Sequence, residues 1–131
     1  MKKVLVFGTF DRLHLGHLNF FKQAKKYGFL FIVVARDQTV KEIKGRWPRQ
    51  NEKKRMTAIE KIGLAKKVLL GNLENPYLII KKIKPNIICL GYDQKSFTKD
   101  LPDKIKEFGL KIKIVRLKAY KPNIYKSSKI I

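Results

Sequence analysis

The sequence predicts an α/β fold built on a doubly wound, five-stranded parallel sheet. Short apolar runs alternate with amphipathic stretches along the chain, and glycine follows several of the apolar runs. Strands that alternate with helices in this way are typical of a parallel sheet covered by helices on both faces. No Gly/Ser linker, internal repeat or low-complexity block interrupts the sequence, so residues 1–131 are expected to form a single domain.

The five expected strands are short and rich in Val, Ile and Leu, as buried strands are. The last of them alternates charged and apolar residues, which is typical of an edge strand. The runs are KVLVF (3–7), FLFIVVA (29–35), KKVLLG (66–71), NIICLG (86–91) and KIKIVRL (111–117).

Amphipathic stretches between these runs are expected to be helices. Residues 17–27 place Leu18, Phe21 and Ala24 on one face, and Gly28 is expected to end this helix. Asn51 is expected to cap a helix that reaches residue 63. One short helix is expected between residue 36 and a basic loop at 45–50. Further helices are expected in residues 76–84 and 99–109, and at the end of the tail at 120–131.

Composition limits the classes of protein that are possible. No apolar stretch approaches the ~20 residues of a membrane span, and MKKVLVF is too short for a signal peptide. The single cysteine, Cys89, lies in an apolar run, which excludes a disulfide framework and favours a cytoplasmic protein. The formal net charge of +21 indicates polyanionic ligands: nucleotides, phosphorylated metabolites, nucleic acid or an acidic membrane surface.

The stretch GTFDRLHLGH (8–17) contains both histidines of the chain and directly follows the first expected strand. A glycine turn that leads into a helix N-terminus suits phosphate, because backbone N–H groups and the helix dipole point toward it. His14 and His17 bracket Gly16, and their imidazoles could donate hydrogen bonds to phosphoryl oxygens during in-line displacement. A zinc pair and a purely structural pair that caps the helix remain open.

This stretch closely resembles the nucleotide-binding motif of the cytidylyltransferase-like nucleotidyltransferases, a GTFD-type turn followed by His-x-Gly-His. The resemblance implies a Rossmann-like α/β/α sandwich of the HUP type. Further blocks follow in the family's order, and they are most similar to those of the archaeal-type FAD synthases and next to those of the glycerol-3-phosphate cytidylyltransferases. These blocks are VVARDQTVKEIKGR (33–46), Arg55, LGYDQ (90–94) and KSSKI (126–130).

The resemblance implies that one group of residues binds the nucleotide. His14 and His17 would stabilise the α-phosphate in the transition state, and Arg55 would clamp nucleotide phosphates. Gly8, Thr9 and Phe10 would supply backbone and side-chain donors to the phosphates. Gly91 and Asp93 would border the base and ribose, and Ser127 and Ser128 would cap the last helix.

A second group would bind the acceptor. Lys44 and Arg46 would hold phosphates of the acceptor or of the triphosphate, and Asp11 and Asp37 would contribute to acceptor or Mg²⁺ binding. Judged without the resemblance, Lys44 and Arg46 could be ordinary surface residues. The other local alternatives are an Arg55–Glu52 pair, a turn at Asp93, a frayed tail at Ser127–Ser128, and simple packing of Trp47 and Tyr92 in place of stacking on a ligand.

The implied reaction joins a nucleoside monophosphate to a phosphorylated acceptor and releases pyrophosphate. ATP and FMN are the preferred substrates, with CTP and glycerol 3-phosphate as the alternative. Mg²⁺ would accompany the nucleotide, no protein ligand set for a metal is assigned, and a homodimer is expected. A basic nucleic-acid-binding module on the same fold is the alternative from another class, although no recognition motif for DNA or RNA is present.

Overall fold

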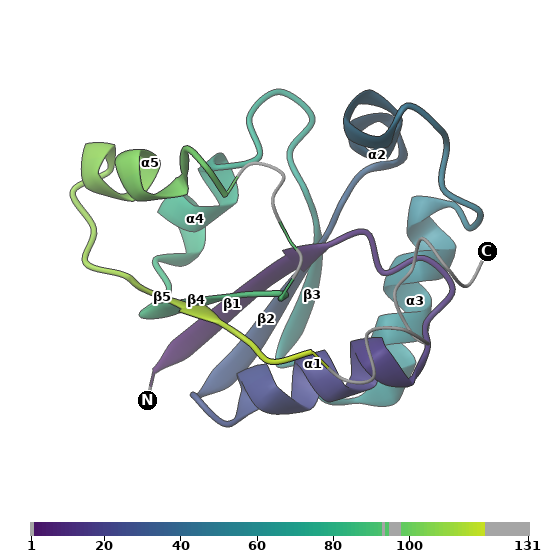
Figure 1. The fold of residues 1–131 in the computed structure, drawn as a ribbon, viewed down its shortest axis with the longest axis horizontal. Coiled ribbons are helices and arrows are strands. Elements are labelled where there is room, and N and C mark those ends of the chain that lie inside the picture. The colour runs from purple at the N-terminus through teal and green to yellow at the C-terminus, as the bar shows by residue number, and fades with distance from the viewer. Residues whose placement is uncertain (1, 93, 95–97, 120–131) are drawn as a thin grey trace.

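The computed structural model describes residues 2–92, 94 and 98–119 (Figure 1). The five expected strands form one all-parallel sheet in the order β3-β2-β1-β4-β5, which confirms the predicted fold class. The fifth strand lies at an edge, as its alternating charge predicted. The strands are β1 (Lys3–Gly8), β2 (Phe29–Val34), β3 (Lys67–Leu70), β4 (Ile87–Leu90) and β5 (Lys113–Arg116).

The strand order reverses its direction at β1, in the centre of the sheet. The chain first winds outward through β2 and β3, and then returns to pair β4 with the other side of β1. Ligands of such sheets bind beyond the carboxyl ends of the strands at this switch point. The GTFD turn leaves β1 at that place, beside the end of β2, where Gly8 pairs with Val34.

Helices cover both faces of the sheet, while the N-terminus of α2 follows directly from the end of β2 (Figure 1). On one face, Val4 and Val6 of β1 pack with α1 and α3. On the other face, Leu5 and Phe7 pack with α4 and α5, because successive strand residues point to opposite sides. The helices are α1 (Leu15–Lys25), α2 (Asp37–Lys44), α3 (Glu52–Ile62), α4 (Leu78–Ile83) and α5 (Leu101–Glu107).

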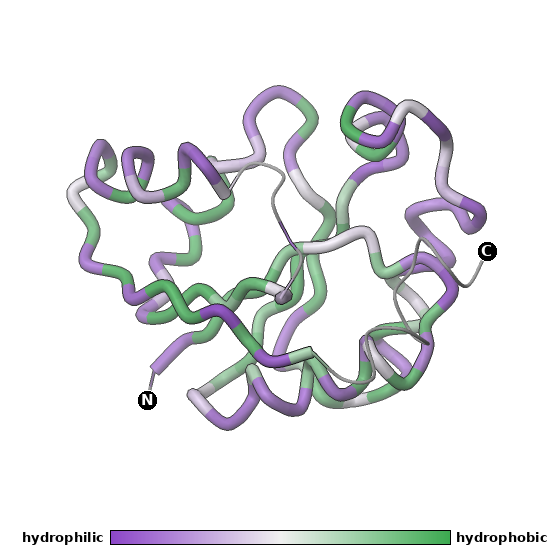
Figure 2. Tube along the Cα trace, viewed as in Figure 1, coloured by the Kyte–Doolittle hydropathy of each residue, from purple (hydrophilic) through white to green (hydrophobic). Residues whose placement is uncertain are grey.

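Hydropathy follows these layers. Figure 2 shows apolar residues along the central strands and hydrophilic residues along the outer helices and the loops. Cys89 is fully buried in β4, and its burial raises the pKa of the thiol to about 11, so this cysteine is an inert core residue as expected. Within the described ranges, no helix is both long and apolar enough to cross a membrane.

The first helix differs from its expected bounds at both ends. It begins at Leu15 instead of His17, because His14 already acts as the N-cap. It ends at Lys25, and Gly28 is required for another reason: a Cβ at this position, which has φ 155°, would lie 2.2 Å from the carbonyl oxygen of Lys2. Gly28 therefore permits the chain to pass close to the start of β1.

Candidate active site

The GTFD turn is shaped by the contact between Gly8 and Phe10. Phe10 has a left-handed backbone (φ 53°), and its buried ring packs edge-on against Phe21 with centroids 4.9 Å apart. A Cβ on Gly8 would lie 2.5 Å from the Cζ atom of this ring. Glycine at position 8 is therefore needed to let Phe10 fold back into the core, which fixes the turn at the end of β1.

The two histidines form the N-terminal cap of α1. The Gly16 N–H donates to Nδ1 of His14 (3.1 Å), and the His14 backbone N–H donates to Nδ1 of His17 (3.3 Å), which makes a reciprocal capping box. The two rings stack with centroids 3.8 Å apart. The capping interpretation of the pair is thus correct, and it holds both imidazoles at the helix N-terminus.

These hydrogen bonds assign the tautomer of each ring. Because Nδ1 accepts a backbone hydrogen bond in both histidines, each neutral ring carries its proton on Nε2. Burial, followed by the nearby charges of His14 and Lys44, lowers the pKa of His17 to about 3, although Asp11 acts in the opposite direction. Burial also lowers the pKa of His14. The pair is therefore a neutral, stacked set of Nε2–H donors.

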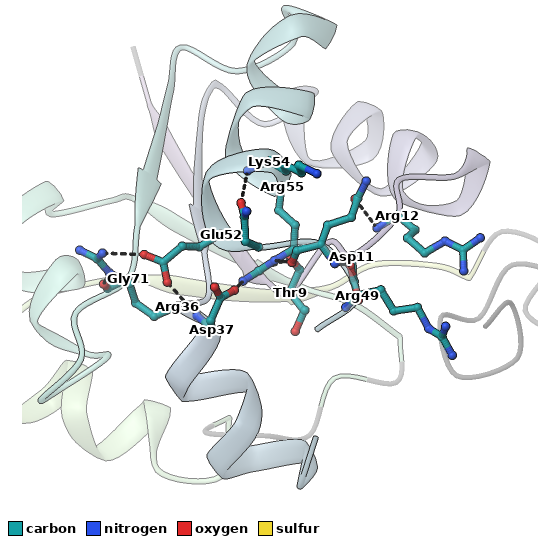
Figure 3. Close-up of polar contacts among 12 residues, drawn as sticks. Thr9, Asp11, Arg12, Arg36, Asp37, Arg49, Glu52, Lys54, Arg55 and Gly71 are labelled. Carbon is teal, nitrogen blue, oxygen red and sulfur yellow. Dashed lines mark hydrogen bonds and ion pairs between the residues drawn. The ribbon is translucent and has the colours of Figure 1, made fainter. Parts of the chain in front are cut away.

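Arg55 contacts this turn and is fully buried (Figure 3). Its guanidinium donates to the carbonyl of Thr9 (2.8 Å), to the carbonyl of Gln50 (3.0 Å) and to the carboxylate of Asp37 (2.7 Å). These three acceptors belong to the turn after β1, the loop before α3 and the first turn of α2. Arg55 therefore joins three segments that surround the site, and its own side chain is occupied by the protein.

A second ion pair extends this network toward β3. Arg36 pairs with Glu52 (2.9 Å) and also donates to the carbonyl of Gly71 (2.8 Å). The other carboxylate oxygen of Glu52 accepts from the backbone N–H of Asp37 (2.9 Å). The alternative that Arg55 pairs with Glu52 is thus wrong: Glu52 bonds to Arg36, and Arg55 bonds to Asp37.

Asp11 fastens the motif turn to the basic loop. Its carboxylate accepts from the backbone N–H groups of Arg49 (2.6 Å) and Gln50 (2.9 Å), and the Arg12 N–H donates to the side chain of Gln50 (3.0 Å). The loop that follows α2 is therefore held against the turn that follows β1. Both segments face the same space.

That space is a pocket of about 320 Å³. Four of its ten lining residues are Lys or Arg, against 31 of 131 in the whole chain, so positive charge is concentrated there. Asp11, Lys44 and Arg46, which the sequence assigned to the acceptor, all line it. The full lining is Thr9, Asp11, Arg12, His14, Val40, Lys44, Arg46, Trp47, Pro48 and Arg49.

Sequence reasoning missed Arg12 and Arg49 in this lining. Arg12 lies within the motif turn but received no role there, and Arg49 lies in none of the family blocks. In a chain with 31 lysines and arginines, no local signal distinguishes these two. Arg12 directly follows Asp11 in the sequence, but the position of Arg49 beside Asp11, which accepts from the Arg49 backbone N–H, could be found only from the fold.

The LGYDQ block lies at the carboxyl end of β4, next to β1. The Gly91 N–H donates to the side chain of Gln94 (3.1 Å), whose amide donates in turn to the carbonyl of Phe7 (3.1 Å). Arg116 of β5 donates to the carbonyl of Gly91 (2.8 Å). Gly91 is therefore close to the start of the motif turn, whereas Asp93, Ser127 and Ser128 lie outside the described residues.

The histidine pair does not belong to a metal cluster within the part of the chain that the structure describes. No group of three or more His, Cys, Asp or Glu side chains there could hold an ion. The Nδ1 atoms of both histidines already accept backbone hydrogen bonds. A structural zinc site, which needs four ligands, is not formed by these residues.

Neutral imidazoles at a helix N-terminus, placed at the switch point of a parallel sheet, agree with the phosphate site that the resemblance to His-x-Gly-His nucleotidyltransferases implied. The chain belongs to the cytidylyltransferase-like family, whose sequence model matches residues 5–131. The resemblance inferred from the motif is thereby confirmed.

Several relatives carry the name FAD synthase. The one from Aciduliprofundum boonei is 40% identical over 92% of this chain and 80% of its own length. The one from Pyrococcus abyssi is 41% identical over 98% of this chain and 89% of its own length. The resemblance to archaeal-type FAD synthases is therefore confirmed as well.

Solved structures share the architecture. A Thermoplasma volcanium protein described as a lipopolysaccharide core biosynthesis protein matches with a TM-score of 0.86 and 38% identity, covering 92% of this chain and 99% of that one. The pantothenate synthetase of Thermus thermophilus matches with a TM-score of 0.62 and 14% identity, over 89% of this chain and 55% of that one, and shows the fold alone.

The Arg55–Asp37 pair predicts an asymmetric loss of stability. Asp37→Asn would leave the fully buried Arg55 guanidinium without an opposing charge, and we expect unfolding free energy to fall by about 3 kcal/mol. Glu107→Gln, which removes the carboxylate of the exposed Lys104–Glu107 pair, should cost less than about 1 kcal/mol. Urea unfolding at neutral pH measures both variants, and equal losses would contradict the structural importance of the buried pair.

The lowered pKa of His17 predicts that acid destabilises the fold. Between the ordinary value of 6.5 and the folded value of about 3, the unfolded chain binds a proton at His17 that the folded chain does not. Stability from this residue is therefore complete above pH 6.5 and is lost as the pH falls toward 3. Urea unfolding of wild type and His17→Gln at pH 7.5 and 5 should show a flatter pH dependence in the variant; identical slopes would contradict the buried neutral imidazole.

Proposed function

We propose that the chain is an FMN adenylyltransferase, which transfers AMP from ATP to FMN and releases pyrophosphate. The observation that supports this most directly is the neutral, stacked His14–His17 pair at the N-terminus of α1, beside a basic pocket. Relatives named FAD synthase, about 40% identical over nearly the whole chain, support ATP and FMN as the substrates.

In this proposal the FMN phosphate attacks the α-phosphorus of ATP in line. A P–O bond forms to the FMN phosphate while the bond to the β-phosphate oxygen breaks, and pyrophosphate leaves with the electron pair. The Nε2–H groups of His14 and His17 donate to the non-bridging oxygens of the α-phosphate, where negative charge develops. No protein nucleophile is required, because positioning and charge stabilisation supply most of the catalysis.

The remaining residues divide between substrate contact and positioning. Thr9, Lys44 and Arg46 line the pocket and would bind phosphates. Arg55 is fully buried and bonded to Thr9 and Asp37, which supports a positioning role exerted through the turn, in place of the direct phosphate clamp expected from the sequence. Gly91, Asp93, Ser127 and Ser128 remain predicted nucleotide-binding residues.

Mg²⁺ would accompany the nucleotide. Mg²⁺ commonly binds through one or two carboxylates together with substrate phosphates, and keeps several waters. The pocket provides one carboxylate, Asp11, whose oxygens also accept two backbone hydrogen bonds. The residues therefore fit an ion that is carried mainly by the phosphates; when bound, it would neutralise charge on the departing pyrophosphate.

A pyrophosphate-release assay tests the proposed reaction. The purified chain with Mg²⁺ is incubated with ATP or CTP against FMN or glycerol 3-phosphate, and products are separated by chromatography. The proposal expects FAD from ATP and FMN. CDP-glycerol as the only product would replace it with the alternative substrates, and no nucleotidyl product with any pair would overturn the assignment.

The family resemblance further implies a homodimer, and we include that state in the proposal. Sedimentation velocity at micromolar concentration should give a mass twice that of the 15.3 kDa chain. A single species at the monomer mass would remove the dimer from the proposal without affecting the reaction.

Substitutions that preserve the capping box should separate catalysis from folding. His14→Asn retains an N-cap acceptor, and His17→Gln retains an amide acceptor at the N3 position, but both lose an Nε2–H donor. We expect kcat to fall by about 10²–10³ in each, with unfolding free energy within about 1 kcal/mol of wild type. Lys22→Gln, an exposed change on the same helix, should leave both quantities unchanged. Near-normal turnover in either histidine variant would contradict the mechanism.

A further inference from the structure

Trp47 lines the basic pocket, yet its side chain is largely exposed. It is the single tryptophan of the chain and has 57% of its surface accessible. Covering this large aromatic ring with a flat apolar ligand would be favourable, because it would remove apolar surface from water and allow ring stacking. An exposed indole in a pocket wall is therefore a candidate stacking surface for a ligand.

The loop that carries Trp47 is anchored at both of its ends. Gly45 ends α2 with a left-handed backbone (φ 76°) two residues before Trp47, and Pro48 restricts the backbone immediately after it. Beyond Pro48, the backbone N–H groups of Arg49 and Gln50 donate to Asp11. Trp47 is thus held beside the motif turn that carries His14.

Three arginines line the same pocket: Arg12, Arg46 and Arg49. Across the described residues, none of the three forms an ion pair, whereas Arg36 and Arg55 do. In Figure 3, the side chains of Arg12 and Arg49 both extend away from the Arg55–Asp37 pair. Several positively charged residues that line one pocket without an ion-pair partner favour an anionic ligand.

We propose that Trp47 is the ring-stacking, specificity-determining residue of the acceptor subsite, and that the surrounding guanidinium groups bind the acceptor's phosphate. The acceptor is thus a phosphate ester that carries a large planar ring system; resting on the proposed function, this is the isoalloxazine of FMN. The phosphate would then lie in the pocket that His14 and Thr9 also line, facing the α-phosphate of the nucleotide.

The size of the pocket agrees with a single substrate. Its volume of about 320 Å³ is at the lower end of the range for small-molecule sites, about 300–1,000 Å³. A polyol phosphate has no ring to cover Trp47, so it would gain only the phosphate contacts. Trp47 thus distinguishes the two kinds of acceptor, because a flavin ring can cover the indole surface and a small phosphorylated acceptor cannot.

Flavin binding to the full chain without ATP tests the stacking. FMN is titrated with protein while flavin emission is followed, because an indole stacked on the ring quenches that emission. Trp47→Leu should raise the Kd for FMN about 5- to 150-fold, the usual worth of one aromatic stack, and should abolish the quenching in the remaining complex. Trp47→Phe should recover most of the affinity. Tyr27→Leu, which removes an exposed aromatic ring just beyond the C-terminal end of α1, should change neither the Kd nor the quenching.

Riboflavin, which has the same ring and no phosphate, separates the two parts of the subsite. Arg49→Gln keeps the backbone hydrogen bond to Asp11 and should weaken the binding of FMN but not the binding of riboflavin. Lys25→Gln removes the same charge from an exposed face of α1 and should leave the binding of both flavins unchanged. In steady state, Trp47→Leu should raise KM for FMN and leave KM for ATP and kcat within about twofold.

The outcomes distinguish this inference from the proposed reaction. If wild type forms FAD but Trp47→Leu leaves the Kd, the KM for FMN and the quenching unchanged, the subsite is wrong and the reaction stands. If Trp47→Leu raises KM for ATP instead, the pocket belongs to the nucleotide and the inference is overturned. If wild type forms no FAD but quenches FMN through Trp47, the subsite stands and the reaction fails.

Discussion

The site depends above all on one buried charge, the guanidinium of Arg55. Removing such a group from water costs several kcal/mol, which only good hydrogen bonds and an opposing charge can offset. Arg55 has both: two backbone carbonyls, from Thr9 and Gln50, and the carboxylate of Asp37. Because these acceptors come from three separate segments, none of the segments can move without leaving a buried donor unsatisfied. The turn after β1, the start of α2 and the loop before α3 therefore keep one arrangement.

Within that arrangement, the bonds that fold the helix also prepare the chemistry. The capping box needs an acceptor at both histidines, so Nδ1 is unprotonated and Nε2 carries the hydrogen. Packing of Phe10 against His17, with ring centroids 5.7 Å apart, helps to bury the second ring and so to keep it neutral. A neutral donor retains its proton while charge develops on a phosphate. Helix capping through Nδ1 and the proposed transition-state stabilisation through Nε2–H thus use the two nitrogens of the same rings, which asparagine or glutamine would not reproduce although either could cap the helix.

Local patterns in the sequence predicted what depends on near neighbours along the chain. The five strands, the N-cap at Asn51 and the turn between the first strand and the first helix follow from hydrophobic runs, glycine positions and helix-start signals, and the structure has them. The alternative that Arg55 pairs with Glu52 was wrong because it rested on proximity in the sequence, while the fold brings Asp37 to Arg55 from another helix. Gly28 was expected to end a helix, but its close approach to Lys2 involves a strand that is distant in sequence. Contacts between distant segments depend on the tertiary arrangement, and the hydrophobic periodicity of the sequence does not predict that arrangement.

The charge balance of the chain follows from how its few carboxylates are used. Of the nine acidic residues that the structure describes, three lie at this site, and each bonds to the protein itself: Asp11 to two backbone N–H groups, Asp37 to Arg55, and Glu52 to Arg36 and the backbone of Asp37. They position the loops while the guanidinium groups in the pocket wall keep their charge for a ligand. A substrate that carries several phosphates then meets a field of one sign at the place where its charge must be neutralised. In the proposed function, the lysine and arginine side chains at this site would take part in substrate binding, and screening by salt would weaken capture of the substrates before it affected the buried pair that holds the site together.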